Sequence, residues 1–319
     1  MVQKRQRDEL VVKIDALVDD AKCFETVRNI RWPDNVCCPK CGSNEVTRHG
    51  HDETQPARQR YRCKGCNSYF DDLSGTIFEG HHQPLRIWIL CLYLMGLNLS
   101  NLQIAAELNL NKDDAQNMTR ALRSGVNARK PSIQLGGEVE CDEVYIVAGH
   151  KGHTEAVKKK GRKGRRNRLK SARGRGTLQK EKPPVLGIIQ RSGQVVIRML
   201  ENVKQVTIEP LIRATVAPET KVFTDEYDIY ARLTQWGYVH GTVCHANKEY
   251  ARDDDGDGFH EIHVNTIEGF WSLLRSWLRP HRGISQERLP LYLGFFEYVH
   301  NVRKRGKALL HSLIEVLVA

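Results

Sequence analysis

Two closely spaced pairs of cysteines constrain the fold of the amino-terminal region more than any other feature of the sequence. The four cysteines are Cys38, Cys41, Cys63 and Cys66. The two Cys-x-x-Cys pairs are separated by 21 residues, against about 15 to 20 in a typical ribbon. Four thiolates at this spacing favour a closed tetrahedral zinc site, so we predict a zinc ribbon over residues 34–80. Cys37, His49 and His51 remain as alternative ligands, although they break the paired spacing.

The rest of the sequence favours metal binding over disulfides. The nine cysteines could pair in an exported protein, but the start, MVQKRQRDEL, is charged where a secretory signal needs an apolar core. The longest apolar run, at 87–97, is too short to span a bilayer and is typical of a buried helix. We therefore expect a cytoplasmic protein with no membrane partner, in which paired cysteines bind zinc.

The net charge of +11 is concentrated in one internal segment. Residues 151–182 hold 14 Lys and Arg against two Glu, with glycines between them and few large apolar side chains. Such a segment cannot bury enough surface to fold alone, so we expect a loop inserted at 150–183. A solubilising tail would lie at a terminus, whereas an internal polycation is suited to a polyanion such as nucleoid DNA. The basic residues expected to contact DNA here are Lys158, Lys159, Lys160, Arg162, Lys163, Arg165 and Arg166.

Helical periodicity flanks the predicted ribbon. Residues 8–31 predict a helix within a lead at 1–33. After the ribbon, the apolar run leads to Ser100, a predicted N-cap, and two short helices follow on either side of a turn at 109–111. This is the helix-turn-helix pattern, although any helical hairpin produces it. If this module, at 81–130, reads DNA, the residues facing the groove are Asn111, Lys112, Gln116 and Arg120.

A strand is predicted after two glycines near the middle of the chain. The segment EVECDEVYIV, residues 138–147, is rich in β-branched and aromatic residues. Val139 and Cys141 fall on one face, whereas Glu140 and Asp142 fall on the other. A carboxylate on an apolar strand is costly unless it is paired, hydrogen-bonded or bound to metal. An edge strand with one wet face would also accept it.

The segments that follow predict a mixed sheet with helices packed on it. A hairpin turns at 191–193, and a helix follows at 207–217. A short strand then ends at Asp225 with a helix after it, and residues 238–245 form a further strand. Ligand sites of such sheets collect at the carboxyl ends of strands, which makes Asp225 a candidate ligand.

A third carboxylate, Glu268, lies at the start of a predicted helix in HVNTIEGFWS. Asn265 and Glu268 have the spacing of a capping box, so this Glu can be a helix cap, a metal ligand or both. Ser272, Arg275 and Arg279 continue the Glu268 face, where the two arginines would contact a DNA backbone. Three carboxylates in one place repel one another unless a cation neutralises them, and hard oxygen ligands favour Mg²⁺ or Mn²⁺.

Five segments resemble DDE-type bacterial insertion-sequence transposases with an amino-terminal zinc ribbon: CDEVY, FTDEYDIY, HVNTIEGFWSLLRSWLRPHRGI, WPDNVCCPKCGS and YRCKGCNSYF. The resemblance covers nearly the whole chain. It implies an α/β fold in which a ribonuclease H-like catalytic domain, a mixed sheet with flanking helices, occupies 135–319. By this match the catalytic metal ligands are Asp142, Asp225 and Glu268, with Asn265 and His263 as supporting residues.

The function that the resemblance implies is DNA transposition. Such an enzyme binds the terminal inverted repeats of its element, self-associates on DNA, and uses two divalent ions for cleavage and strand transfer into target DNA. Two alternatives remain open. A catalytically inactive DNA-binding relative would need only the zinc and basic parts, and Mg²⁺-dependent nicking distinguishes it. A simple nuclease of the same fold would cut DNA but never join ends.

Overall fold

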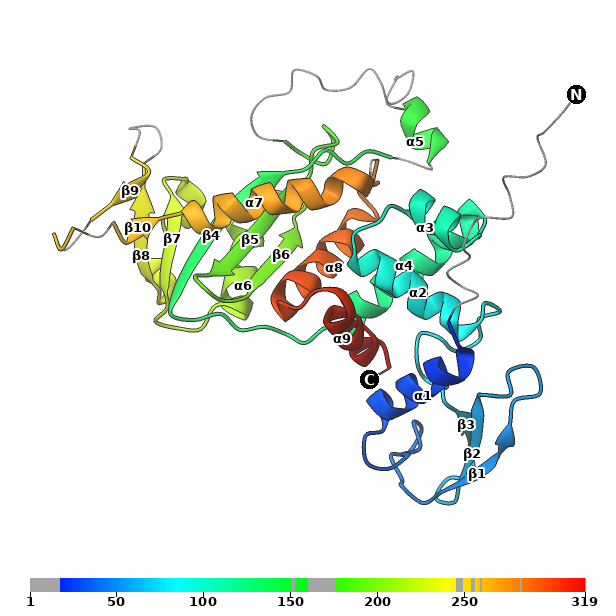
Figure 1. Ribbon diagram of the computed structural model, residues 1–319. Coiled ribbons are helices and arrows are strands. Elements are labelled where there is room, and N and C mark those ends of the chain that lie inside the picture. The colour runs from blue at the N-terminus through cyan, green and yellow to red at the C-terminus, as the bar shows by residue number, and fades with distance from the viewer. Residues whose placement is uncertain are drawn as a thin grey trace, which may run out of the picture. The chain divides into compact units, whose positions relative to one another are not determined.

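The computed structural model describes residues 18–150, 153–159, 176–244, 249–253, 256–258, 260–281 and 283–318. The chain divides into two compact units, and Figure 1 labels their elements. The first unit comprises Met1–Arg129 and Lys304–Ala319, and the second comprises Lys130–Arg303.

The first unit combines a three-stranded antiparallel sheet with helices. Its elements are α1 (Asp20–Arg31), β1 (Val46–His51), β2 (Gln59–Cys63), β3 (Tyr69–Asp71), α2 (Leu85–Gly96), α3 (Asn101–Glu107), α4 (Lys112–Arg129) and α9 (Gly306–Val318). Within this unit α9 packs against α1, α2 and α4. The domain boundaries expected from the sequence stay a prediction, although this last helix packs with the amino-terminal elements.

The helix-turn-helix pattern is formed by α3 and α4. Ser100 caps α3 as predicted: its hydroxyl accepts from Gln103 N at 3.3 Å, and the Gln103 side chain accepts from Ser100 N at 3.0 Å. The next helix is capped in a similar way, because Asn111 Oδ1 accepts from Asp114 N at 2.7 Å. The two caps fix where each helix starts and therefore fix the turn between them.

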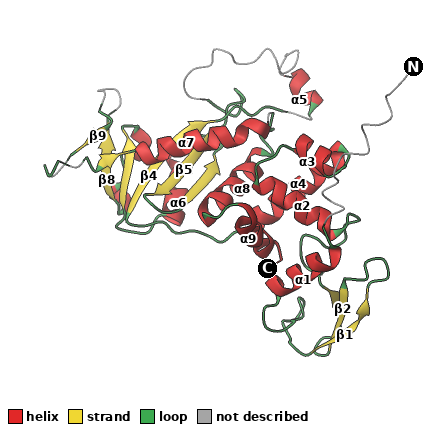
Figure 2. Ribbon diagram, viewed as in Figure 1, coloured by secondary structure: helices red, strands yellow, loops and turns green. Residues whose placement is uncertain are grey.

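The second unit is built on one mixed sheet with helices on both faces (Figure 2). Its elements are β4 (Glu138–Tyr145), α5 (Thr154–Lys159), β5 (Pro184–Gln190), β6 (Val195–Met199), α6 (Gln205–Thr215), β7 (Lys221–Asp225), η3 (Asp228–Tyr230), η4 (Thr234–Trp236), β8 (Val239–Val243), β9 (Ala251–Arg252), β10 (Ile262–His263), α7 (Asn265–Leu278), η6 (Arg279–His281) and α8 (Leu289–Val302). The five-stranded sheet has the order β6-β5-β4-β7-β8. Strands β4, β7 and β8 are parallel, and β5 is antiparallel to both of its neighbours. This is the ribonuclease H-like fold that the sequence predicts.

Each face of this sheet has its own core. Helices α7 and α8 cover one face, where Trp271 packs with Val144 and Phe223. Helix α6 covers the other, where Ile208 packs with Cys141. Strand β4 pairs on both sides and is therefore central, so the alternative of a wet edge strand is wrong. Glu140 of this central strand is fully buried, so its carboxylate needs partners within the fold.

Two predicted segments differ from the structure. Helix α5 forms inside the loop expected at 150–183. The helix expected after Asp225 is replaced by two 3-10 turns, η3 and η4. Ile229, Leu233 and Trp236 are buried at helix-like intervals, but hydrogen bonds such as Tyr230 N to Tyr227 O, at 3.0 Å, close tighter turns.

The amino-terminal helix begins at Asp20, where Asp19 caps it. The part of the predicted helix at 8–17 lies outside the described residues. Among the described residues, no helix combines the length and the apolar character that crossing a lipid bilayer requires.

Candidate metal centres

The four predicted cysteine ligands come together in the first unit. Their Sγ atoms all lie within 4.8 Å of one another, closer than any other set of three or more Cys, His, Asp or Glu among the described residues. Cys38 Sγ lies 3.7 Å from Cys66 Sγ, and Cys41 Sγ lies 3.6 Å from Cys63 Sγ. A regular tetrahedron with Zn–S bonds of about 2.3 Å separates its sulfurs by roughly 3.8 Å. The arrangement therefore fits one structural zinc ion.

Both cysteine pairs are shaped by the same kind of turn. The amide of each first cysteine donates to the carbonyl five residues later, at 2.9 Å in the first pair and 3.0 Å in the second. The residue after each second cysteine, Gly42 or Asn67, has a positive φ, which glycine and asparagine adopt most readily. Hydrogen bonds from Ser68 lower the pKa of Cys66 to about 6, which favours the thiolate that zinc binds.

The alternative zinc ligands do not belong to this cluster. Cys37 Sγ lies 3.4 Å from the carbonyl of Asn35, and the ring of His49 packs 4.9 Å from that of Tyr69. His51 is an exposed residue of β1. The four cysteines of the paired spacing are therefore the ones that lie together.

A buried carboxylate holds the ribbon sheet to α1. Asp72 accepts two hydrogen bonds from Arg28, at 2.9 and 2.7 Å, one from Gln59 N at 2.8 Å, and one from the Tyr61 hydroxyl at 3.1 Å. The partners hold the Asp72 carboxylate in place, because a buried charge is costly when it lacks an ion pair or hydrogen bonds. The ribbon is thus supported at one place by its thiols and at another by this ion pair.

The first two predicted acidic residues lie level with each other on neighbouring parallel strands. The pairing of β4 with β7 ends at Glu140 opposite Phe223, and the same offset places Asp142 level with Asp225. Phe223 packs in the core beneath α7, so the alternation along β7 puts Asp225 on that face too. Sheet register thus gathers two carboxylates that are far apart in the chain.

Helix α7 contacts Asp142 directly. Trp271 Nε1 donates to Asp142 Oδ2 at 2.8 Å. Gly187 of β5 is paired with Asp142 and makes room for the indole, since a Cβ there would lie 2.3 Å from Trp271 Cη2. The pKa of Asp142 is raised to about 6, first by burial and then by the negative charges of Asp225 and Glu268. Asp225 and Glu268 therefore both act electrostatically on Asp142.

The capping box predicted at the start of α7 is wrong. The helix begins at Asn265, and its N-cap is Val264, which makes no side-chain hydrogen bond. The cap comes instead from the sheet, because Glu140 Oε2 accepts from Ile267 N at 2.9 Å. This contact joins residues 127 positions apart, so local sequence patterns could not reveal it. Glu268 is an exposed residue in the first turn of the same helix.

A second group that sequence reasoning missed is Arg191, in the hairpin turn after β5. It donates to Glu140 Oε1 at 2.8 Å and to the carbonyls of Glu261 and His263 at 2.8 and 3.0 Å. His263 Nδ1 lies 3.3 Å from Glu140 Oε1. His263, expected to support the acidic site, therefore lies in the cluster around Glu140. Asn265 is exposed and donates its backbone N–H to His263 Nδ1 at 3.3 Å.

Few of the basic residues predicted to contact DNA can be placed. Lys158 and Lys159 end α5, where Lys158 pairs with Glu155 at 3.1 Å. Arg275 and Arg279 are exposed at the carboxyl end of α7. Five others lie outside the described residues: Lys160, Arg162, Lys163, Arg165 and Arg166.

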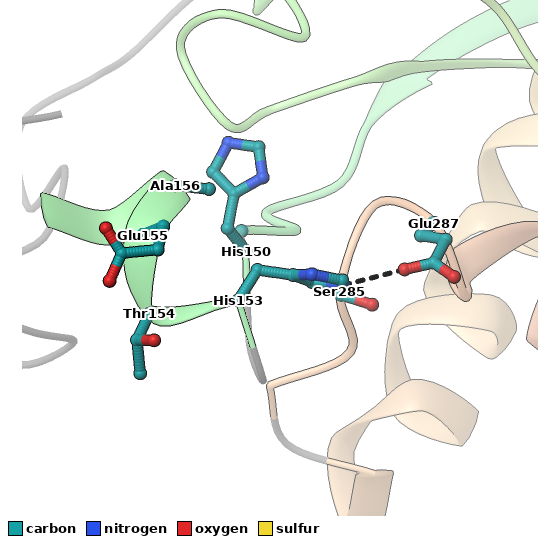
Figure 3. A pocket seen from close by; sticks show the side chains of 8 residues that line it. His150, His153, Thr154, Glu155, Ala156, Ser285 and Glu287 are labelled. Atoms are coloured by element: carbon teal, nitrogen blue, oxygen red, sulfur yellow. Dashed lines mark hydrogen bonds and ion pairs between the residues drawn. The ribbon is translucent and has the colours of Figure 1, made fainter. Parts of the chain in front are cut away.

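A cavity of about 530 Å³ lies beside the connection that leads to the basic segment (Figure 3). Its lining includes His150, His153 and Glu287, and His153 Nε2 lies 2.7 Å from Glu287 Oε2. The two segments that form it are joined by a hydrogen bond from Gln286 N to Gly149 O, at 2.9 Å. None of the three acidic residues lines this cavity. The cavity is therefore separate from the candidate acidic site.

The sheet order, the helix layers and the cluster of four thiols define a ribonuclease H-like domain that follows a zinc ribbon. Comparison with known families identifies the same two parts. The ISXO2-like transposase domain matches residues 134–301, and the transposase zinc-ribbon domain matches residues 18–68. The chain belongs to the ISXO2-like transposase family.

Relatives support this membership along the whole chain. A protein in the transposable element ISH50 of Halobacterium salinarum is 32% identical over 309 residues, covering 96% of this chain and 99% of the relative. A transposase-like protein of Haemophilus influenzae is 28% identical over 103 residues, covering 32% of this chain and 77% of the relative. A chain in a simian T-cell lymphotropic virus intasome structure, in complex with the PP2A regulatory subunit B56 gamma, is 11% identical. It aligns over 69% of this chain and 74% of its own with a TM-score of 0.29, too low to carry an argument.

Proposed function

We propose that this transposase cleaves DNA at the ends of its element and joins the freed ends to target DNA, with Asp142, Asp225 and Glu268 as the metal ligands. The observation that carries the proposal is the level placement of Asp142 and Asp225 on neighbouring strands, under the helix that bears Glu268. Family membership supports the class of reaction, which is phosphodiester exchange.

The donor set fits Mg²⁺ or Mn²⁺. All three side chains offer hard oxygens, and burial raises the pKa of Asp142, with a further contribution from the charges of Asp225 and Glu268. A pair of ions about 3.5–4 Å apart suits a set of three carboxylates, since each ion takes only part of the set. When bound, such ions supply Lewis-acid chemistry and neutralise charge at the reacting phosphate.

The reaction consists of two displacements at phosphorus. Water attacks the phosphodiester at the element end, and the 3′ oxygen leaves and takes a proton. That 3′-hydroxyl then attacks a target phosphodiester and displaces a target 3′ oxygen. In this scheme Trp271 keeps the Asp142 carboxylate in one orientation, and Gly187 lets the indole lie against the sheet. Fixed ligands lower the reorganisation needed at each step.

DNA binding is part of the same proposal. On the outer face of the ribbon sheet, Thr47 of β1 lies opposite Arg62 of β2, and Arg62 lies opposite Tyr69 of β3. Tyr69 is 61% exposed, and the Arg62 guanidinium lies 5.7 Å from its ring centroid. A cation beside an exposed aromatic ring can contact phosphate and base together. We propose that this face, the exposed side of α4 and the basic segment bind the element ends, and that the protein self-associates on them.

The test uses the zinc-loaded full chain with a duplex that carries the terminal repeat of the element, in Mg²⁺. We expect nicking and strand joining by the native protein. In Asp142→Asn and Asp225→Asn both products should fall by on the order of a thousandfold, because a carboxamide cannot supply the ligand charge. DNA affinity should change by less than about threefold, since neither residue is a proposed DNA contact. Glu201→Gln, an exposed change beyond β6, is the control and should remain active.

Each contrary result has a distinct meaning. Full activity in either Asp variant would refute the assignment of the metal ligands. Nicking without joining would identify a nuclease. DNA binding without Mg²⁺-dependent nicking by the native chain would identify a DNA-binding relative without catalysis.

A further inference from the structure

Two residues outside the acidic trio connect the strand that carries Asp142 to the helix that carries Glu268. We propose that Glu140, held in place by Arg191, is a positioning residue that sets the separation of the Asp142 and Glu268 side chains. The inference rests on the proposed catalytic role of those two carboxylates. It assigns Glu140 no contact with metal or DNA.

Strand β4 and helix α7 are joined by two matched contacts. Glu140 accepts from Ile267 N at 2.9 Å, and Asp142 accepts from Trp271 Nε1 at 2.8 Å. Two strand residues advance about 6.6 Å, and four helix residues advance about 6 Å, so both contacts can form without bending either element. The first contact lies one residue from Glu268 and two from Asp142, so it joins the two chain segments that carry them.

Arg191 fixes the approach to the helix as well as its first turn. Its guanidinium bonds to Glu140 and to the carbonyls of Glu261 and His263, which flank and end β10 just before α7. It also lies 4.1 Å from the ring centroid of Phe223 on β7. One side chain therefore joins the hairpin turn, the two strands of the acidic site and the entry to α7.

Burial makes this arrangement specific. Glu140 is fully buried, and a buried carboxylate is stable only where partners satisfy its charge and its lone pairs. Its two oxygens accept hydrogen bonds from different donors. Oε1 accepts from Arg191, and Oε2 accepts from Ile267 N. A carboxamide has an NH2 donor in place of one of these oxygens, so in glutamine one of the two N–H groups would face another donor. Glu140→Gln should therefore loosen the first turn of α7 while it changes side-chain volume very little.

The neighbouring Glu138 gives a matched control. It lies on the same strand and bonds to the same guanidinium, at 3.1 Å, but its side chain is 42% exposed. Glu138→Gln weakens the ion pair with Arg191 and leaves the bond between Glu140 and Ile267 in place. Any difference between the two variants therefore reports the link to α7 and not the loss of a charge near Arg191.

The experiment measures Mn²⁺ binding to the zinc-loaded full chain by electron paramagnetic resonance, without DNA. Glu140→Gln should raise the Mn²⁺ dissociation constant about tenfold, and Glu138→Gln should change it less than twofold, because outer partners of ligands typically contribute at this scale. Amide exchange by mass spectrometry should show faster exchange at 265–268 in Glu140→Gln, with the rest of α7 protected. The Mg²⁺ concentration for half-maximal nicking should rise in parallel.

Two results would overturn the proposal. One is a folded Glu140→Gln protein with native Mn²⁺ affinity and native exchange at 265–268. The other is an equal effect of Glu138→Gln. If Glu140→Gln does not fold, Arg191→Lys is judged by the same measurements, since lysine keeps the charge but cannot reach all the acceptors. Parallel assays of Asp142→Asn separate the failures: an inactive Asp142→Asn with a native-like Glu140→Gln refutes only the positioning role.

Discussion

The two candidate metal centres of this chain are assembled in different ways. The four thiols of the ribbon come from two short turns, and each turn is specified by its own local sequence. The acidic residues are separated by 83 and then 43 positions, and Asp225 and Glu268 come near enough to act on Asp142 through the arrangement of β4, β7 and α7. The first site is therefore fixed by residues within it, whereas the second is fixed by residues around it.

This difference determines where each site is vulnerable. A ribbon with a small apolar core depends on its ligands, because metal binding is coupled to folding. The acidic site lies on a five-stranded sheet with a core on each face, so its fold does not need the metal. Its geometry, however, depends on contacts such as that of Trp271 with Asp142, which changes outside the ligand set can disturb.

The largest effect should follow removal of zinc. Cys63→Ser, or chelation of the native protein, should unfold the ribbon, because structural zinc contributes about 10–16 kcal/mol to such small domains. The second unit should keep its fold. Amide exchange should become fast over 36–71 and stay slow over β4 to β8, and affinity for the terminal repeat should fall. Cys37→Ser, outside the cluster, should retain one zinc ion per chain; loss of zinc there would mean that the assigned ligand set is incorrect.

A smaller effect should come from crowding the acidic site without touching a ligand. Alanine at Gly187 would place a Cβ 2.3 Å from the Trp271 ring, so the indole must shift. Overpacking of this kind costs about 1–3 kcal/mol in unfolding free energy. We expect nicking to fall at least about tenfold, because the hydrogen bond to Asp142 is lost with the shift.

Gly136→Ala is the control for that change. A Cβ there would lie 3.9 Å from Ala217, an ordinary contact, so stability should change by less than about 0.5 kcal/mol. Urea unfolding and nicking assays of both variants check the pair. Native activity in Gly187→Ala would show that Trp271 does not set the orientation of Asp142.

The sequence predicted what local rules determine. Hydrophobic alternation located β4 and put Glu140 and Asp142 on one face, and cysteine spacing located the four thiols that cluster in the ribbon. The pattern also suggested a cap at Asn265, but the true cap is Glu140, because a buried carboxylate in another element competes better for the same amides. No local pattern encodes that contact. The helix expected after Asp225 failed for a related reason: the connection between two parallel strands, and not periodicity, set its shape.

The smallest effect on the free energy of unfolding should come from substitutions at two helix starts that look alike in sequence. Ser100 precedes α3 and Asn265 is the first residue of α7. Each has a polar residue three positions later, but only Ser100 makes the capping hydrogen bonds. Ser100→Ala should therefore lower unfolding free energy by about 1 kcal/mol, and Asn265→Ala by less than about 0.5 kcal/mol. Equal losses in urea unfolding would mean that Asn265 caps α7 in solution. Nicking provides a separate readout, since a stable but inactive Asn265→Ala would assign its side chain to the metal site that the family resemblance implies.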